Sequence, residues 1–236
     1  MKDYRSPSNP SRRRLFQAAG AAGAAAALPL GNAAAQEKKP AYVFFNPAEA
    51  AFTEAAVARL IPKDETGPGA LEAGVANYID QQLGGAWGAG ERLYRSGPWR
   101  PGSRTQGYQL PFTPAELFRT AIRAINQKAK FSALGAKEQD AFLDALQKGS
   151  EDLGGVPSNV FFESLLEVTI EGFFADPAYG GNRDMVAWKM IGFPGAYADF
   201  YELVDRHNLA YKAPPTSLAQ DARGHVHVMS ILKKAK

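Results

Sequence analysis

Few side chains in this sequence of 236 residues have the types needed for catalysis or metal binding. It has no cysteine, which excludes disulfides, a thiolate nucleophile, iron–sulfur ligation and covalent haem attachment through this chain. Its three histidines are His207, His225 and His227. The His225-Val226-His227 spacing could place two imidazoles on one side of a strand as a metal-binding pair. No third or fourth ligand is suggested nearby, so we favour a surface or partner-facing tail.

Three carboxylates, Glu171, Asp176 and Asp184, could form an acid–base set. Asp176 precedes a proline, which is typical of a turn residue, and Asp184 suits the first turn of a helix, so a structural role is the better interpretation. The sequence contains no G-x-S-x-G, H-E-x-x-H, glycine-rich phosphate loop or Rossmann fingerprint. We therefore predict no catalytic, cofactor-binding or metal-binding residue in this chain.

These carboxylates lie in or beside an unusual stretch, residues 171–195, which we call the signature stretch. Its sequence, EGFFADPAYGGNRDMVAWKMIGFPG, is too rich in glycine and proline for one helix and too aromatic for a solvated linker. Asp176-Pro177 should end the preceding helix, and Gly180-Gly181 should allow positive φ. Asn182 is expected to cap a short helix on which Met185, Trp188 and Ile191 share a face. Any one of its aromatics could simply fill the core, but a turn of this kind usually presents something for binding.

The signature stretch resembles that of the gluconate 2-dehydrogenase subunit 3 family, and a looser resemblance begins at about Phe112. The residues that carry it are Gly172-Phe173-Phe174, Asp176-Pro177, Tyr179-Gly180-Gly181-Asn182, Trp188 and Ile191-Gly192-Phe193-Pro194-Gly195. The resemblance implies a non-catalytic small subunit that needs no cofactor of its own. In such complexes a large subunit related to the glucose–methanol–choline oxidoreductases holds FAD and oxidises a sugar, sugar acid or glycoside. Electrons then pass to a cytochrome c subunit, which carries haem c, or to another acceptor.

The resemblance also implies that the small subunit assists the folding and export of the flavin subunit and stabilises the complex. We expect the interface to consist of Phe173, Phe174, Asp176, Pro177, Tyr179, Gly180, Gly181, Asn182, Trp188, Gly192, Phe193, Pro194 and Gly195, with Trp99 from a separate loop. A freestanding periplasmic enzyme and a helical ligand-binding protein are the alternatives. Purified protein that turned over a substrate alone, or kept a ligand without a flavoprotein, would favour them.

Residues 1–35 have the layout of an export signal. A basic region that includes Arg12, Arg13 and Phe16 fits the twin-arginine motif, and an alanine- and glycine-rich run follows it. Cleavage is expected after Ala35. This run is short and weakly apolar for a membrane anchor, which is one alternative; an ordinary basic tail is the other. The sequence predicts a periplasmic protein, reaching the outer face of the inner membrane only through its complex.

The charge balance changes once this segment is set aside. It holds five of the 27 basic and one of the 24 acidic residues, which leaves 22 basic and 23 acidic residues in 36–236. The remaining chain is almost neutral, so nothing indicates a nucleic-acid partner.

The rest of the chain predicts an all-α fold, a single irregular helical domain over residues 36–236 with long ordered loops. Residues 36–45 read as a linker, 86–112 as a long loop containing Arg and aromatic residues, and 213–236 as an extended tail. Helices are expected over 47–60, 71–83, 113–129 and 136–147. A longest, apolar helix should open at Ser158 or Asn159 and lead into the signature stretch, and a short one is expected over 197–207.

Overall fold

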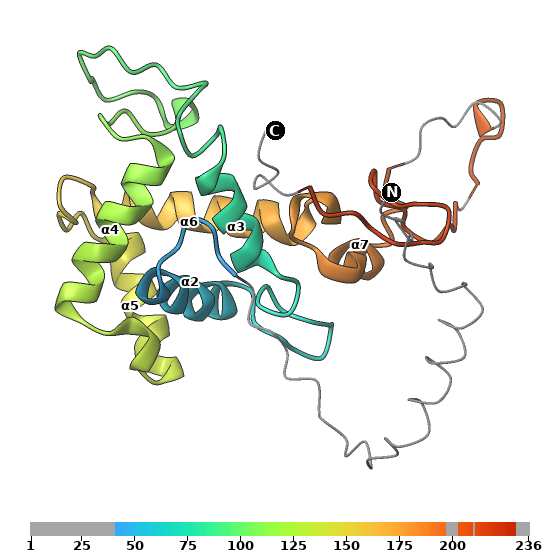
Figure 1. Ribbon diagram of the computed structural model, residues 1–236, viewed down its shortest axis with the longest axis horizontal. Helices are drawn as coiled ribbons and strands as arrows, with labels where there is room; N and C mark the ends of the chain where they lie inside the picture. Colours follow the sequence, from blue (N-terminus) through green and yellow to red (C-terminus); the bar gives the residue numbers. More distant parts are fainter. Residues whose placement is uncertain (1–40, 197–202, 210, 230–236) are drawn as a thin grey trace, which may run out of the picture. The chain divides into compact units, whose positions relative to one another are not determined.

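The computed structural model describes residues 41–196, 203–209 and 211–229. Within these ranges it contains no strand, only isolated bridges, so the predicted all-α class is confirmed. The α-helices are α2 (Pro47–Leu60), α3 (Val75–Gly84), α4 (Pro114–Lys128), α5 (Ala136–Lys148), α6 (Ser158–Phe174) and α7 (Val186–Ile191) (Figure 1). The 3₁₀ turns are η1 (Arg104–Gln106), η2 (Phe131–Ala133), η3 (Pro177–Tyr179) and η4 (Arg183–Met185).

Helices α2 and α4 begin where the sequence predicts, because both starts are encoded locally. The Asn46 side chain accepts hydrogen bonds from the backbone of Ala48 and Glu49, while the Glu49 carboxylate accepts one from the Asn46 backbone. Thr113 and Glu116 form the same reciprocal capping box on α4. Each pair satisfies backbone N–H groups that a helix start leaves without partners.

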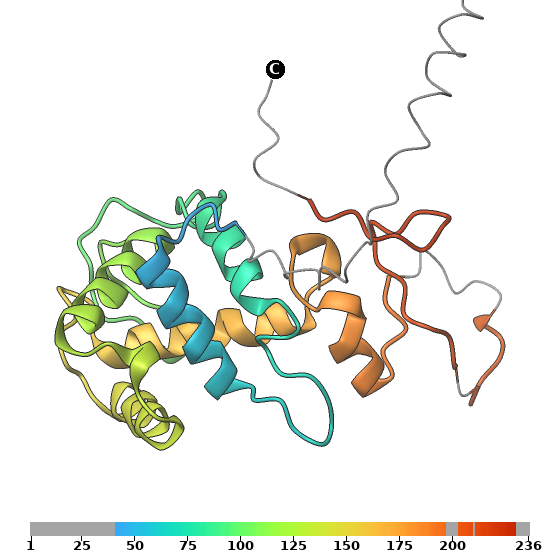
Figure 2. The same ribbon diagram turned by 60° about the horizontal axis from the view of Figure 1, so that its bottom comes forward.

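Helix α6 is the centre of the core. It packs against α2, α3, α4, α5 and α7. Figure 1 shows it crossing behind α3 and α4, and in Figure 2 α2 passes in front of it. Phe161 on α6 contacts Phe52 of α2 and Phe118 of α4, with ring centroids 6.0 and 5.5 Å apart. Phe52 also contacts Phe131, at 5.1 Å. All four rings are buried, so this aromatic cluster joins α6 to its neighbours.

Two expected helix starts differ from the structure. Helix α3 begins at Val75 rather than at residue 71, because Gly74 adopts a left-handed conformation with φ of 78° and interrupts the helical path. Helix α7 begins at Val186, since the expected first turn is the 3₁₀ turn η4, in which Asp184 has φ of 56°. The helix expected over 197–207 falls mainly outside the described residues.

An extended arm, residues 41–45, precedes α2 and is bound to the helical domain. The buried Asp80 carboxylate on α3 accepts hydrogen bonds from the backbone N–H groups of Val43, Phe44 and Phe45 at 2.7–2.9 Å. The Arg119 guanidinium lies over the Phe44 ring and donates to the Phe44 carbonyl at 2.7 Å. Three N–H donors compensate the loss of hydration of the Asp80 charge, so the arm is a fixed part of the fold.

None of the described helices is long and apolar enough to cross a membrane. The predicted export signal, with Arg12, Arg13, Phe16 and the expected cleavage after Ala35, lies outside the described residues.

Candidate partner-binding site

The signature stretch leaves the C-terminus of α6 and folds into a tight double turn against α3. The Asp176 side chain accepts a hydrogen bond from the Ala178 backbone at 2.9 Å, which starts η3 with Pro177 at its first position. Gly180 follows with φ of 92°, and its carbonyl accepts a hydrogen bond from Asn77 of α3. A Cβ on Gly180 would lie 2.6 Å from the Asn77 amide, so only glycine fits here without rearrangement.

The Asn182 side chain connects the two ends of this turn by hydrogen bonds. Its side chain is fully buried, donates to the Ala175 carbonyl at 3.0 Å and accepts from the Ala187 backbone at 2.9 Å. It therefore caps α7 as a buried residue four positions before the helix begins, rather than as the residue next to the helix that the sequence suggested. Its role is to hold the end of α6 to the start of α7.

The aromatic side chains of the signature stretch divide into two groups. Phe173 and Trp188 are buried, and the Trp188 indole donates to the Phe174 carbonyl at 2.8 Å. Phe174, Tyr179 and Phe193 keep exposed ring surface, and Phe193 stands edge-on to Trp188 with ring centroids 5.2 Å apart. The buried pair thus supports the exposed rings on a fixed backbone.

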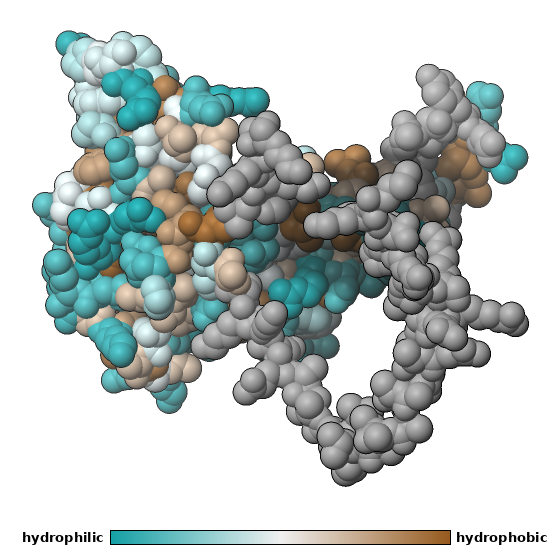
Figure 3. Space-filling model, viewed as in Figure 1, coloured by the Kyte–Doolittle hydropathy of each residue, from teal (hydrophilic) through white to brown (hydrophobic). Residues whose placement is uncertain are grey.

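Two exposed aliphatic residues of α7 extend this surface. We call the exposed set Phe174, Tyr179, Met190, Ile191 and Phe193 the signature face. The sequence pattern placed Ile191 on the buried side of α7 with Trp188, but it is 60% exposed, because the helix ends immediately after it at the left-handed Gly192. Figure 3 shows apolar residues over the junction between α6 and this stretch, beside hydrophilic surface.

The C-terminal segment 216–229, which we call the strap, lies along the signature stretch. Thr216 pairs with Gly195 in a parallel bridge, and its N–H donates to the Pro194 carbonyl at 3.1 Å. Asp176 accepts from the Ser217 hydroxyl at 2.5 Å and from the Leu218 backbone at 2.8 Å. Pro194, Gly195 and Asp176 therefore hold the strap in place, a long-range role that local sequence patterns could not reveal.

Trp99 lies apart from the signature stretch. It stands near Tyr94, with ring centroids 6.4 Å apart, and both line a hollow of about 330 Å³ formed by the 86–112 loop. Among the described residues that line this hollow, none belongs to the signature stretch. Trp87 of the same loop lines a larger hollow with Tyr179, and Leu93 lines both hollows. The sequence did not single out Trp87 and Leu93 as site residues, although the aromatic residues of the 86–112 loop could have indicated them.

The residues considered for catalysis are not assembled into a site. Asp221 receives hydrogen bonds from the backbone of Arg223 and His225, and its carboxylate lies 3.2 Å from His227 Nε2 and 3.8 Å from His225 Nδ1. The His225 backbone bond is the main cause that lowers the pKa of Asp221. Within 41–196, 203–209 and 211–229, no group of three or more His, Asp or Glu side chains could hold a metal ion.

Glu171 and Tyr78 face each other where α6 meets α3, with the phenol oxygen 3.5 Å from the carboxylate. Partial burial raises the pKa of Tyr78 to about 12, and the Glu171 charge adds to this shift. Partial burial, with the nearby Glu167, also raises the pKa of Glu171. The Asp176 carboxylate binds the strap, so Glu171 and Asp176 serve separate structural contacts, while Asp184 is exposed in η4.

The comparisons with known proteins agree with the resemblance in the sequence. The family model described as gluconate 2-dehydrogenase subunit 3 matches residues 47–195, from the first residue of α2 to the last glycine of the signature stretch. No curated protein and no solved structure matches the chain. The arm before α2 and the strap both lie outside the matched range.

Proposed function

Because the chain belongs to the gluconate 2-dehydrogenase subunit 3 family, we propose that it is a non-catalytic small subunit whose signature face docks on an FAD-containing subunit. Family membership implies the small subunit of a gluconate 2-dehydrogenase-type complex and partnership with dehydrogenase subunits. The flavin, the glucose–methanol–choline type of the partner and a cytochrome c subunit with haem c are parts of the proposal.

The signature face is the observation that carries this proposal. Five apolar side chains with 38–60% of their surface exposed lie on one short stretch of chain. Their backbone is fixed by Asn182, by the Trp188 indole bond and by the strap. Exposed apolar residues on a rigid support are typical of a protein–protein interface, because little conformational entropy is lost when the partner binds.

Docking can be tested with charges placed on the signature face. Ile191→Asp and Phe193→Asp should each reduce recovery of the flavin subunit with the tagged chain by about tenfold, because a carboxylate would be desolvated at the interface. Val204→Asp is the matched control, since Val204 is 64% exposed and lies outside the signature stretch. Equal recovery with all three variants would contradict the proposal.

We also propose that the complex is exported to the periplasm through the twin-arginine signal of this chain. The support is the layout of residues 1–35 in the sequence. The arm that follows is bound by Asp80 and Arg119, so residue 43 is already part of the folded body. Arg12→Lys with Arg13→Lys should leave both subunits in the cytoplasm; periplasmic flavin subunit in that double variant would contradict this route.

A further inference from the structure

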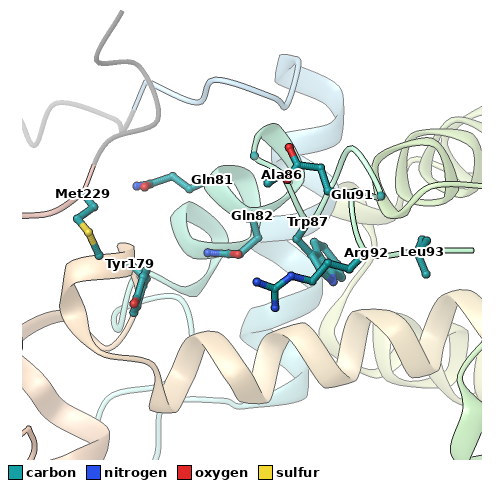
Figure 4. A pocket seen from close by; sticks show the side chains of 11 residues that line it. Gln81, Gln82, Ala86, Trp87, Glu91, Arg92, Leu93, Tyr179 and Met229 are labelled. Carbon is teal, nitrogen blue, oxygen red and sulfur yellow. The ribbon is translucent and has the colours of Figure 1, made fainter. Parts of the chain in front are cut away.

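A hollow of about 550 Å³ lies beside α3 and is lined in part by the signature stretch, and we call it the socket. Figure 4 shows Tyr179 and Met229 together at one end, while Trp87 and Leu93 lie toward the other. Tyr179 comes from the signature stretch, but Trp87 and Leu93 come from the 86–112 loop. Met229 comes from the strap, beyond residue 195, where the family match ends. The socket is thus assembled from three distant parts of the chain.

The walls of the socket are apolar and uncovered. Trp87, Leu93, Tyr179 and Met229 are each between 39% and 50% exposed. Polar side chains occur among them: Gln82 and Arg92 point into the space between the two ends in Figure 4, and Gln81 and Glu91 lie at its border. Trp, Tyr and Arg are the residue types enriched at protein-binding hot spots, where an anchor side chain fills a pocket.

Each wall is held by backbone hydrogen bonds, so the socket exists before any partner binds. The Gly88 N–H donates to the Gln82 carbonyl at 3.1 Å, and the Gly88 carbonyl accepts from Ala115 at the start of α4. These bonds fix the turn that carries Trp87. At the other end the Met229 N–H donates to the Ala178 carbonyl at 2.7 Å, next to Tyr179. A preformed pocket loses little entropy when it is filled.

We propose that the socket receives an apolar side chain, aromatic or aliphatic, of the FAD-containing subunit, and that the strap is therefore part of the docking site. This inference rests on the proposed function. Tyr179 belongs both to the signature face and to the socket, so the two surfaces are continuous. The mostly apolar lining favours a hydrocarbon or aromatic side chain over a sugar as its occupant.

The test compares variants in the co-expressed complex of the full chain with its flavin subunit. Met229→Arg places a charge in the socket, and Trp87→Ala removes one wall. Each should raise the dissociation constant of the two subunits by about tenfold or more. Val204→Arg is the matched control, since Val204 is 64% exposed and lies outside the signature stretch, the 86–112 loop and the strap. Thermal unfolding of each variant checks that the fold is retained.

The outcomes separate this inference from the proposed function. If the wild-type chain recovers no flavin subunit, the proposed function fails. If the wild-type complex forms but Met229→Arg and Trp87→Ala bind as tightly as Val204→Arg, only the socket assignment is overturned.

Two other occupants would overturn the assignment as well. If the isolated chain is a dimer that Met229→Arg converts to a monomer, a second copy fills the socket. If deletion of residues 230–236 exposes Trp87 to a fluorescence quencher in a Trp99→Phe background, the C-terminus of the chain itself fills it. The proposal expects a monomer and unchanged quenching.

Discussion

Asp176 and Ser217 lie 41 residues apart, and the Ser217 hydroxyl donates a hydrogen bond of 2.5 Å to the Asp176 carboxylate. The same carboxylate accepts from the backbone of Ala178 and Leu218. The buried Asp176 side chain therefore shapes the turn within the signature stretch and binds the strap to it. This explains how a segment outside the family match comes to lie on the surface that we assign to the partner.

Asp176→Asn should release the strap while leaving the helical body folded. The amide keeps the size of the carboxylate but presents N–H groups to donors, so we expect a loss of about 1.5–3 kcal/mol in the free energy of unfolding. Proteolytic cleavage within 218–229 should become faster. Asp184→Asn is the control, because Asp184 is exposed. Equal cleavage rates in the two variants would show that Asp176 does not hold the strap.

Asp80→Asn should detach the arm before α2. Loss of the buried charge that accepts three backbone N–H bonds should lower the free energy of unfolding by about 2–4 kcal/mol. Hydrogen exchange at Val43, Phe44 and Phe45 should accelerate with it. Asp140→Asn, which breaks a solvent-exposed pair with Arg59, should have a much smaller effect. Unchanged exchange in the arm would contradict this account of the anchor.

Gly181→Ala should disrupt the close approach within the signature stretch. A Cβ at Gly181 would lie 2.1 Å from the carbonyl oxygen of Gly172, far inside contact distance. The backbone must then move, and we expect a loss of about 3 kcal/mol or more in unfolding free energy. Gly67→Ala is the control, since its nearest neighbour would be the Met190 sulfur at 3.9 Å. Chemical denaturation that gave equal values for both would refute the packing argument.

Glu171→Gln should change the pH dependence of stability in a defined direction. Because burial raises the pKa of Glu171 in the folded state, its contribution to stability is complete below the unfolded value of about 4.3 and is lost as pH rises through the folded value. Glu171→Gln has no carboxyl group to ionise, so its stability does not fall in this way as pH rises. It should therefore be as stable as the wild type near pH 3 and more stable at pH 7. If the wild type instead gained stability relative to the variant from pH 3 to pH 7, the pKa of Glu171 would be lowered by folding, not raised.

The parts of this fold that sequence predicts are those set by neighbouring residues. Asn46-Pro47 and Thr113-Pro114 mark the starts of α2 and α4 because cap, proline and glutamate act within one turn. The start of α3 was misplaced, since helical spacing begins at Leu71 but Gly74 takes a left-handed conformation that no periodicity reveals.

The candidate site was only partly predictable for the same reason. The signature stretch was found by its composition, but which of its rings would be exposed depends on packing between distant segments. Trp188 is buried and its indole donates to the Phe174 carbonyl, whereas Ile191, three residues later, is exposed. The socket needs Trp87, Tyr179 and Met229, which come together only through tertiary contacts. No spacing rule connects residues so far apart in sequence.

The most direct test of the account is to purify the tagged full chain from cells that co-express it with the genes beside its own, and to record subunit masses and the visible absorption spectrum. We expect a yellow complex in which a larger subunit carries the flavin, and loss of both in Phe193→Asp but not in Val204→Asp. A colourless chain that purifies alone from these cells would contradict the assignment of the signature face to a flavin subunit.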